Sequence, residues 1–138
     1  MIGDGTSSSP RTTPTQTILP TGTHALGVYA NARGTCAVFA EESVSGDFHS
    51  AAQYCWGRNW AGEVGDGSTT QRDSPTRVKS ELSPSSLSSG GFHTCAIADD
   101  PSVVNCWGRD YLGQLGAKMD PEDLDANSGR SDPIRVLL

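Results

Sequence analysis

The stretch Cys-Trp-Gly-Arg-Asn at residues 55–59 decides the fold, because it returns as Cys-Trp-Gly-Arg-Asp at residues 106–110. Each copy leads into a Gly-x-x-Gly motif, at residues 62–65 and 113–116. Two further stretches also return, Thr-Cys-Ala-Val at 35–38 as Thr-Cys-Ala-Ile at 94–97, and Ile-Gly-Asp-Gly at 2–5 as Val-Gly-Asp-Gly at 64–67. The chain is therefore an internal repeat with a period of about 50–60 residues, and such repeats bury their apolar faces mainly against one another.

The composition favours short strands over helices. Only 35% of the residues are apolar, glycine, serine, threonine and proline are abundant, and no amphipathic stretch lasts for three helical turns. Such a chain forms many short strands separated by turns. The strands that we expect are Ala25–Tyr29, Thr35–Ala40, Gln53–Gly57, Ser74–Val78, Ser85–Ser89, Thr94–Ala98, Val103–Gly108 and Asp132–Val136. This all-β pattern gives four antiparallel strands per period, which is the content of one propeller blade.

The charge and the apolar runs argue against two classes of partner. A net charge of -6 disfavours nucleic acid, whose phosphates are neutralised by clustered lysine and arginine. The longest apolar runs, such as Val136–Leu138, are far too short to cross a bilayer. We therefore expect a protein partner, no nucleic acid and no membrane insertion.

The four cysteines fall into two hairpins whose registers match them in pairs. One hairpin places Cys95 opposite Cys106, and the equivalent hairpin, with a longer loop, places Cys36 opposite Cys55. Directly opposed residues have Cβ atoms about 4.5–5.5 Å apart, a little wider than a disulfide needs, so local twist would allow bridging. Disulfides would indicate an oxidising compartment. The alternatives are reduced core thiols and a zinc site, although the close Cys-x-x-Cys spacing of zinc sites is absent.

The second copy carries a longer series of motifs in a fixed order. Residues 89–97, 106–116 and 132–136 contain Gly-x-x-His, Trp-Gly, Gly-Gln-Leu-Gly and Pro-x-x-Val in succession. This series resembles a repeat of the regulator of chromosome condensation type, and the match extends over nearly the whole chain. The resemblance implies a β-propeller, usually of seven blades, and paired cysteines are typical of its extracellular versions.

The repeat divides the chain into three parts. Residues 1–23 are expected to be the end of a preceding repeat, residues 24–79 the first blade, and residues 80–138 the second blade with an acidic insertion at 117–130. About two blades cannot close a ring. We therefore expect a segment of a longer protein, or a subunit that completes a ring, stack or filament with other copies, and a start within a repeat favours the segment.

Two loops depart from the repeat and are the candidate partner-binding sites. The first copy has Gly34 where the motif has histidine, and its loop at 43–50 is expanded, while the second copy has the insertion after Gly116. Loops that vary on a fixed frame of strands commonly carry binding specificity. The candidate residues are Asp47, Phe48, His49, Asp120, Glu122, Asp123 and Asp125. For the acidic ones a solvated loop is the favoured interpretation, because charge runs usually keep loops hydrated, and a binding surface is the alternative.

The recurring side chains are expected to be structural. Trp56 and Trp107 are assigned to core packing, with a ligand-stacking surface as the alternative. His93 is assigned to a hydrogen-bonded strand position in the repeat core rather than to catalysis or metal binding. Arg58 and Arg109 are expected to pair with a carboxylate or carbonyl of the adjacent blade, with surface recognition as the alternative.

No motif in the chain indicates catalysis. The Gly-Asp-Gly sequences around Asp4 and Asp66 are explained by turns that need positive φ, without calcium. No catalytic triad, phosphate loop or cofactor motif is visible. The function expected is therefore a non-enzymatic structural or protein-recognition propeller segment, outside the cell or on its surface. The alternative is nucleotide exchange on a small GTPase, the activity of the founding member of the family that the chain resembles.

Overall fold

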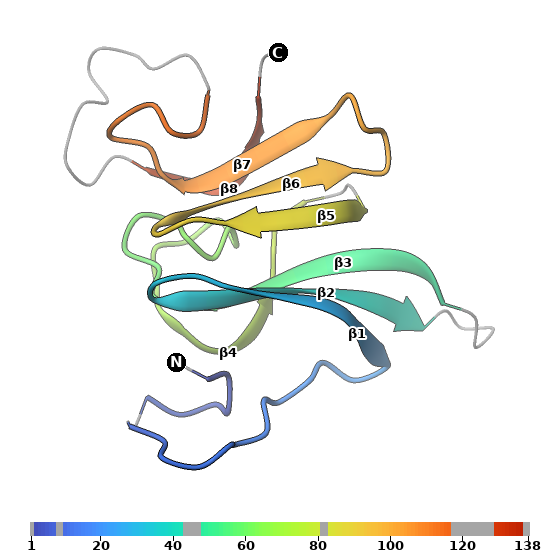
Figure 1. Cartoon of the computed structure of the whole chain (residues 1–138), viewed down its shortest axis with the longest axis vertical. Helices are drawn as coiled ribbons and strands as arrows, with labels where there is room; N and C mark the ends of the chain where they lie inside the picture. Colours follow the sequence, from blue (N-terminus) through green and yellow to red (C-terminus); the bar gives the residue numbers. More distant parts are fainter. Residues whose placement is uncertain (1, 8–9, 43–47, 81–82, 117–128, 137–138) are drawn as a thin grey trace.

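The computed structural model describes residues 2–7, 10–42, 48–80, 83–116 and 129–136, and of residues 48–50 it describes the backbone alone. Within these ranges the chain forms two four-stranded antiparallel sheets and no helix. Figure 1 shows the sheets one above the other, with the N-terminal segment beside the first sheet. The expected all-β fold of two four-stranded blades is confirmed.

Both sheets are simple meanders. The first has the order β1-β2-β3-β4 and the second β5-β6-β7-β8, so neighbours in sequence are neighbours in space. The strands are β1 (Thr23–Ala30), β2 (Gly34–Glu42), β3 (Phe48–Gly57), β4 (Arg72–Arg77), β5 (Pro84–Ser89), β6 (His93–Ala98), β7 (Val104–Arg109) and β8 (Gly129–Arg135). Each overlaps one strand expected from the sequence. The prolines of β4 and β8 lie on edge strands, where a missing backbone donor is tolerated.

Strand β2 is buried on both faces, because it lies between the N-terminal segment and the second sheet. Cys36 and Val38 belong to the core between the two sheets, whereas Ala37 and Phe39 belong to a second core on the opposite face. All four side chains are buried. This alternation follows from the two-residue period of a strand. It explains why the segment reads as a continuous apolar run rather than as an alternating one.

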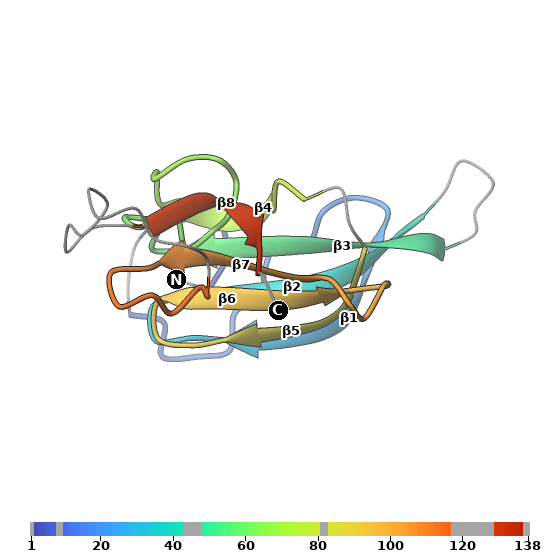
Figure 2. The same ribbon diagram turned by 90° about the horizontal axis from the view of Figure 1, so that it is seen from above.

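The second sheet repeats the first and packs on it. Leu87 of β5, Ala96 of β6 and Trp107 of β7 join Cys36, Val38 and Cys55 in the core between the sheets. Seen from above in Figure 2, the strand order of the second sheet follows that of the first, from β5 near β1 to β8 near β4. The two copies of the repeat are therefore stacked as successive blades.

Candidate interaction surfaces

The junction between the blades is built on one tryptophan and one glycine. The indole of Trp107 is fully buried and covers Gly65, which has a φ of 75°. A Cβ at residue 65 would lie 2.7 Å from Trp107 Cδ1, so only glycine leaves room for the ring. The Nε1 of Trp107 donates a hydrogen bond to the carbonyl of Glu63 at 3.2 Å. The Trp-Gly and Gly-x-x-Gly motifs thus meet across the junction.

The same contact occurs one blade earlier. Trp56 is 4% exposed, and a Cβ at Gly3, whose φ is 80°, would lie 2.8 Å from its Nε1. That Nε1 is buried without a hydrogen-bond acceptor among the described residues. Met1 stands where Glu63 stands in the repeat, and it lies outside those residues. Trp56 therefore seats on the N-terminal segment as Trp107 seats on the first blade.

Backbone hydrogen bonds repeat in the same way. Gly67 N donates to Ser131 O of β8 at 2.9 Å, and Gly5 N donates to Asp73 O of β4 at 3.0 Å. Two further equivalent bonds close the segments that carry these glycines, from Lys79 N to Gly65 O and from Ile18 N to Gly3 O, both at 2.8 Å. The fourth strand of each blade is thus attached to the segment before that blade.

Gly116 is the third glycine of this series, and no tryptophan covers it among the described residues. Its φ is 66°, and the Leu115 before it is as buried as Val64 is before Gly65. The only described heavy atom that would come within 4 Å of a Cβ at residue 116 is Val136 Cγ1, at 3.2 Å. Gly116 of the second blade therefore has the conformation of the glycines on which Trp56 and Trp107 pack, but no indole lies over it among the described residues.

The outward faces of the two-blade stack carry exposed apolar side chains. Val28 lies opposite Ala37 on β2 and so shares its face, but Val28 is 64% exposed, as is Leu26 on the same strand. On the far side of the second sheet, Ile97 is 39% exposed and lies opposite Val104. Large apolar residues on both outer faces of a sheet stack are surfaces that further blades cover in repeat proteins.

The cysteines are bonded as Cys36 with Cys55 and Cys95 with Cys106, each with an S–S distance of 2.11 Å. These are the pairs that the hairpin registers indicate, and the described chain has no free cysteine. The first disulfide is sealed between the sheets, 3.7 Å from Thr94 Oγ1. The second occupies the equivalent position on the outward face of the second sheet, where Cys95 is half-buried.

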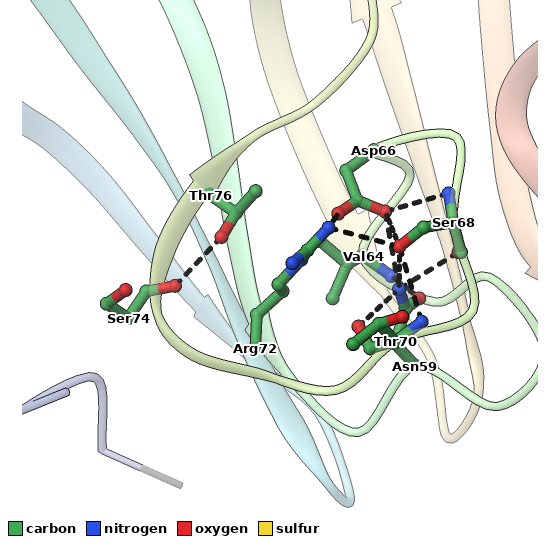
Figure 3. Close-up of polar contacts among 8 residues, drawn as sticks. All are labelled: Asn59, Val64, Asp66, Ser68, Thr70, Arg72, Ser74 and Thr76. Carbon is green, nitrogen blue, oxygen red and sulfur yellow. Dashed lines mark hydrogen bonds and ion pairs between the residues drawn. The ribbon is translucent and has the colours of Figure 1, made fainter. Parts of the chain in front are cut away.

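A buried asparagine organises the loop that follows the first Trp-Gly motif, as Figure 3 shows. Asn59 is fully buried, and its Nδ2 donates to the carbonyls of Ser68 and Thr70, both at 2.9 Å. Its Oδ1 accepts from Val64 N at 2.8 Å. In the second copy Asp110 keeps the equivalent acceptor role, toward Leu115 N at 2.9 Å. A carboxylate cannot donate, and this substitution coincides with the inserted connection.

Asp66 completes this cluster and fixes the Gly-Asp-Gly turn. One of its oxygens accepts from Ser68 N at 3.0 Å and from Ser68 Oγ at 2.8 Å, and the other accepts from Arg72 Nε at 2.6 Å. Burial acts to raise the pKa of Asp66, but the hydrogen bonds from Ser68 and Arg72 outweigh it and hold the pKa below its ordinary value. Asp4 forms the same arrangement with Thr6 and Arg11. Hydrogen bonds from neighbouring side chains and backbone groups of the chain thus hold both Gly-Asp-Gly turns.

Arg58 departs from the sequence expectation. Arg58 pairs with Glu63 at 3.5 Å, and this carboxylate belongs to its own repeat rather than to the adjacent blade. What Arg58 contacts in the second blade is an aromatic ring, Phe92, with 5.3 Å from Cζ to the ring centroid. Arg109 stacks on the same ring, which belongs to its own blade, at 4.8 Å. For Arg58, a cation–π contact across the junction thus takes the place of the expected carboxylate in the adjacent blade.

The other candidate residues divide as follows. His93 is half-buried at the start of β6 and lies outside the fully buried core. Phe48 and His49 begin β3, at the end of the sheets opposite to the Trp-Gly loops. Outside the described residues lie Asp47, Asp120, Glu122, Asp123 and Asp125. The sequence analysis did not identify Asn59, Phe92 or the packing of tryptophan on glycine, although the repeated spacing of Gly65 and Trp107 was a signal for that packing.

The described residues contain no group of three or more His, Cys, Asp or Glu side chains placed to hold a metal ion. In the same residues, no helix has the length and apolar character needed to cross a membrane.

Residues 54–97 match the family model of the Regulator of chromosome condensation (RCC1) repeat. The matched residues run from β3 to β6, so the stretch that is similar to one RCC1 repeat contributes strands to both sheets and contains Gly65, on which Trp107 packs. No curated protein matches the chain.

Among the solved structures that share the fold are two of yeast RCC1 and one of human WBSCR16. Yeast RCC1 (Prp20), solved bound to Kap60, superposes with a TM-score of 0.67 and 16% identity over 88% of this chain and 26% of that one. Prp20p from Saccharomyces cerevisiae, studied for its binding to Gsp1p and histones, superposes with a TM-score of 0.67 and 16% identity over 88% of this chain and 27% of that one. Human WBSCR16 superposes with a TM-score of 0.66 and 15% identity over 88% of this chain and 27% of that one. The chain thus spans about a quarter of the length of these proteins.

Proposed function

We propose that this chain is a non-enzymatic structural and protein-recognition segment of a larger β-propeller. The observation that carries the proposal is the repeated seating of tryptophan on glycine. Trp56 on Gly3 and Trp107 on Gly65 join successive units, and Gly116 offers the same seat to a further tryptophan. The exposed apolar faces at Val28 and Ile97 are the surfaces that neighbouring blades would cover.

The same contacts support a division of the chain within that propeller. Residues 1–23 are proposed to close a preceding repeat, because the described part of this segment repeats the turn and backbone bonds of residues 64–80. Residues 24–79 and 80–138 are then successive blades, the second with an acidic insertion at 117–130. Partners are neighbouring repeats of a longer chain or other subunits, with no role for nucleic acid or membrane insertion.

The two disulfides support an extracellular or cell-surface location. Such bonds persist in oxidising compartments and are rare where glutathione and thioredoxin keep thiols reduced. In each blade the bond joins the two central strands of the sheet. This cross-link suits a propeller that must stay folded without the protection of the cell.

The proposal is tested on the purified 138-residue chain by small-angle scattering and hydrogen exchange across a concentration series. We expect concentration-dependent association or weak amide protection, because both outer faces lack a neighbour. A compact and strongly protected monomer at every concentration would overturn the proposal.

The second candidate is regulation of a small GTPase, and the fold shared with Prp20p, studied for binding Gsp1p, favours it. The rate at which a small GTPase releases a fluorescent guanine nucleotide distinguishes the two candidate functions. We expect the chain to leave the release rate unchanged. An acceleration in proportion to the chain concentration would replace the first proposal by the second.

A further inference from the structure

Residues 6–17, which lie between the first Gly-Asp-Gly turn and strand β1, consist almost entirely of three residue types. Eight of these twelve residues are serine or threonine, two are proline, and the others are Arg11 and Gln16. The segment has no aliphatic or aromatic side chain that could be buried against a sheet. Segments rich in serine, threonine and proline are common carriers of O-linked sugars in secreted proteins. The composition therefore indicates a candidate modification site.

The segment lies outside both sheets and is held at two places. Arg11 Nε donates to Asp4 Oδ2 at 3.0 Å, and Ile18 N donates to Gly3 O at 2.8 Å. Between these contacts, residues 12–16 are exposed and make no backbone hydrogen bond to another residue that the structure describes. Figure 1 shows the segment below the first sheet, on the side away from the second sheet. The stretch is therefore fixed at both ends and open to solvent between them.

A second serine-rich stretch shows why composition alone does not select the site. Strand β5 contains four serines in six residues, but it is paired with β6. Ser85 Oγ donates to Ala98 O at 3.0 Å, and the hydroxyls of Ser89 and Thr94 are hydrogen-bonded to each other at 3.0 Å. A strand held in a sheet must unfold locally before a transferase can enclose its backbone. The structure thus favours the N-terminal segment over β5.

Thr12 and Thr13 present two free hydroxyl groups in this segment. Both side chains are exposed, and neither hydroxyl has a hydrogen-bond partner among the described residues. Thr15, by contrast, donates its hydroxyl to Thr13 O at 3.2 Å. Thr13 directly precedes Pro14, and the residue before a proline is restricted to extended conformations. The two hydroxyls are therefore accessible nucleophiles on a locally extended backbone.

The position of Thr12 and Thr13 in the repeat keeps them at the rim of a longer propeller. Ile18 N and Lys79 N make equivalent hydrogen bonds to the first glycine of the preceding Gly-Asp-Gly turn. Counted back from these two residues, the threonines correspond to residues 73–74 at the start of β4. β4 is the last strand of its sheet, and such an edge strand keeps one side open. A preceding blade that paired with the segment would therefore leave the threonines at an edge.

We propose that Thr12 and Thr13 are acceptor sites for O-linked N-acetylhexosamine, which a glycosyltransferase of the secretory pathway adds from a nucleotide-diphosphate sugar. The proposal rests on the proposed extracellular location. In the transfer, the threonine Oγ1 forms a bond to the anomeric carbon of the sugar, and the bond from that carbon to the diphosphate oxygen breaks. The nucleoside diphosphate leaves with the bonding electron pair, and the proton of the hydroxyl passes to it.

The test expresses the full chain behind a cleavable signal peptide in a cultured human cell line and measures the intact mass of the secreted protein after sialidase and galactosidase treatment. The chain has no Asn-x-Ser or Asn-x-Thr sequence, so an attached N-acetylhexosamine is O-linked. We expect masses raised by whole N-acetylhexosamine units, which electron-transfer fragmentation should place at Thr12 and Thr13. The double variant Thr12→Ala, Thr13→Ala should lose this fraction. The matched control is Thr69→Ala, an exposed threonine after the second Gly-Asp-Gly turn, which should keep it.

A second measurement separates the acceptor sites from the location of the protein. Chain purified from a bacterial periplasm is incubated with a purified N-acetylgalactosaminyltransferase and its UDP-sugar, and we expect transfer to Thr12 or Thr13 that the double variant loses. Such transfer to a chain that the human cells fail to secrete would support the sites and overturn the proposed location.

A secreted chain without sugar overturns the proposal, as does sugar at Thr69 or on β5 in place of Thr12 and Thr13, or phosphate at Thr13. Circular dichroism on each variant establishes that the fold is kept. The stacking of blades is measured separately by scattering, so an unmodified chain leaves the propeller-segment proposal standing.

Discussion

At the scale of single residues, the glycines beneath the tryptophans limit what the chain can tolerate. Gly65 combines a positive φ with an indole at a distance that excludes any Cβ. Backbone strain and overpacking therefore act together at this position. The tolerance of a glycine in this fold depends on what another blade places above it.

Gly65→Ala should lower the free energy of unfolding by about 2–4 kcal/mol, because its methyl group must displace Trp107 and the backbone must leave its conformation. The measurement is urea unfolding followed by tryptophan fluorescence. Gly91→Ala is the control, since a Cβ there meets nothing within 4 Å. Equal losses of unfolding free energy in the two variants would contradict the close packing of Trp107 on Gly65.

Asn59→Asp should destabilise the chain by about 1–3 kcal/mol, because the carbonyls of Ser68 and Thr70 lose a buried donor. Thermal unfolding measures the change. Asn31→Asp serves as control, because the Oδ1 of Asn31 only accepts from Arg33 N and a carboxylate keeps that role. An Asn59→Asp variant as stable as the parent would mean that the loop keeps its conformation without the hydrogen bonds of the amide.

Asp66 makes the stability depend on pH in the acid range. Hydrogen bonds hold its pKa in the folded chain below its ordinary value, so its contribution is present above the unfolded pKa of about 3.9 and is lost as the pH falls through the lower folded pKa. Asp66→Asn should therefore be less stable than the parent at neutral pH, and the difference should vanish at the acid end. Parallel urea titrations across pH test this, and a difference independent of pH would refute it.

At the scale of elements, the two hairpins are equal in register but unequal in surroundings. Cys36 pairs with Cys55 between the sheets, and Cys95 pairs with Cys106 on an outward face. The sequence predicts the registers, because the turn positions and the alternation of each strand set them. It does not predict the difference in burial, which arises because the second sheet covers the disulfide of the first sheet while the disulfide of the second sheet faces outward.

We expect Cys95–Cys106 to be reduced before Cys36–Cys55 in the native chain, because a thiol reagent reaches the half-buried Cys95 without separating the blades. Graded dithiothreitol, alkylation and peptide mass mapping measure the order. Preferential reduction of Cys36–Cys55, a linkage between the repeats or four free thiols in the untreated chain would each contradict the structure.

At the scale of the whole molecule, a stack of two blades leaves one apolar face open on each side. The N-terminal segment covers Trp56 on the first face but leaves Leu26 and Val28 exposed. Such surfaces favour association with further blades or further copies. We therefore expect the outer faces to dominate the behaviour of the isolated chain.

Val28→Lys, alone or with Leu26→Lys, should reduce the self-association of the purified chain, because a charge on the open face opposes burial there. Analytical ultracentrifugation gives the measure. Leu112→Lys is the matched control, an apolar residue that is 75% exposed in a loop rather than on a sheet face. If the control variant reduces association as much as Val28→Lys does, the contact lies at the loops and the open face is not the interface.

The local half of this structure follows from the sequence alone. The return of Cys-Trp-Gly-Arg and Gly-x-x-Gly predicted the period, the strands and the hairpin registers, because strand pairing between neighbours in sequence depends on local alternation and turns. The packing of one sheet on the other establishes that Trp107 covers Gly65, that Phe92 of the second blade reaches Arg58 of the first, and that one disulfide is covered while the other is not. These features depend on both sheets, and their geometry follows from how one blade is stacked on the next, which no periodicity within a single blade specifies.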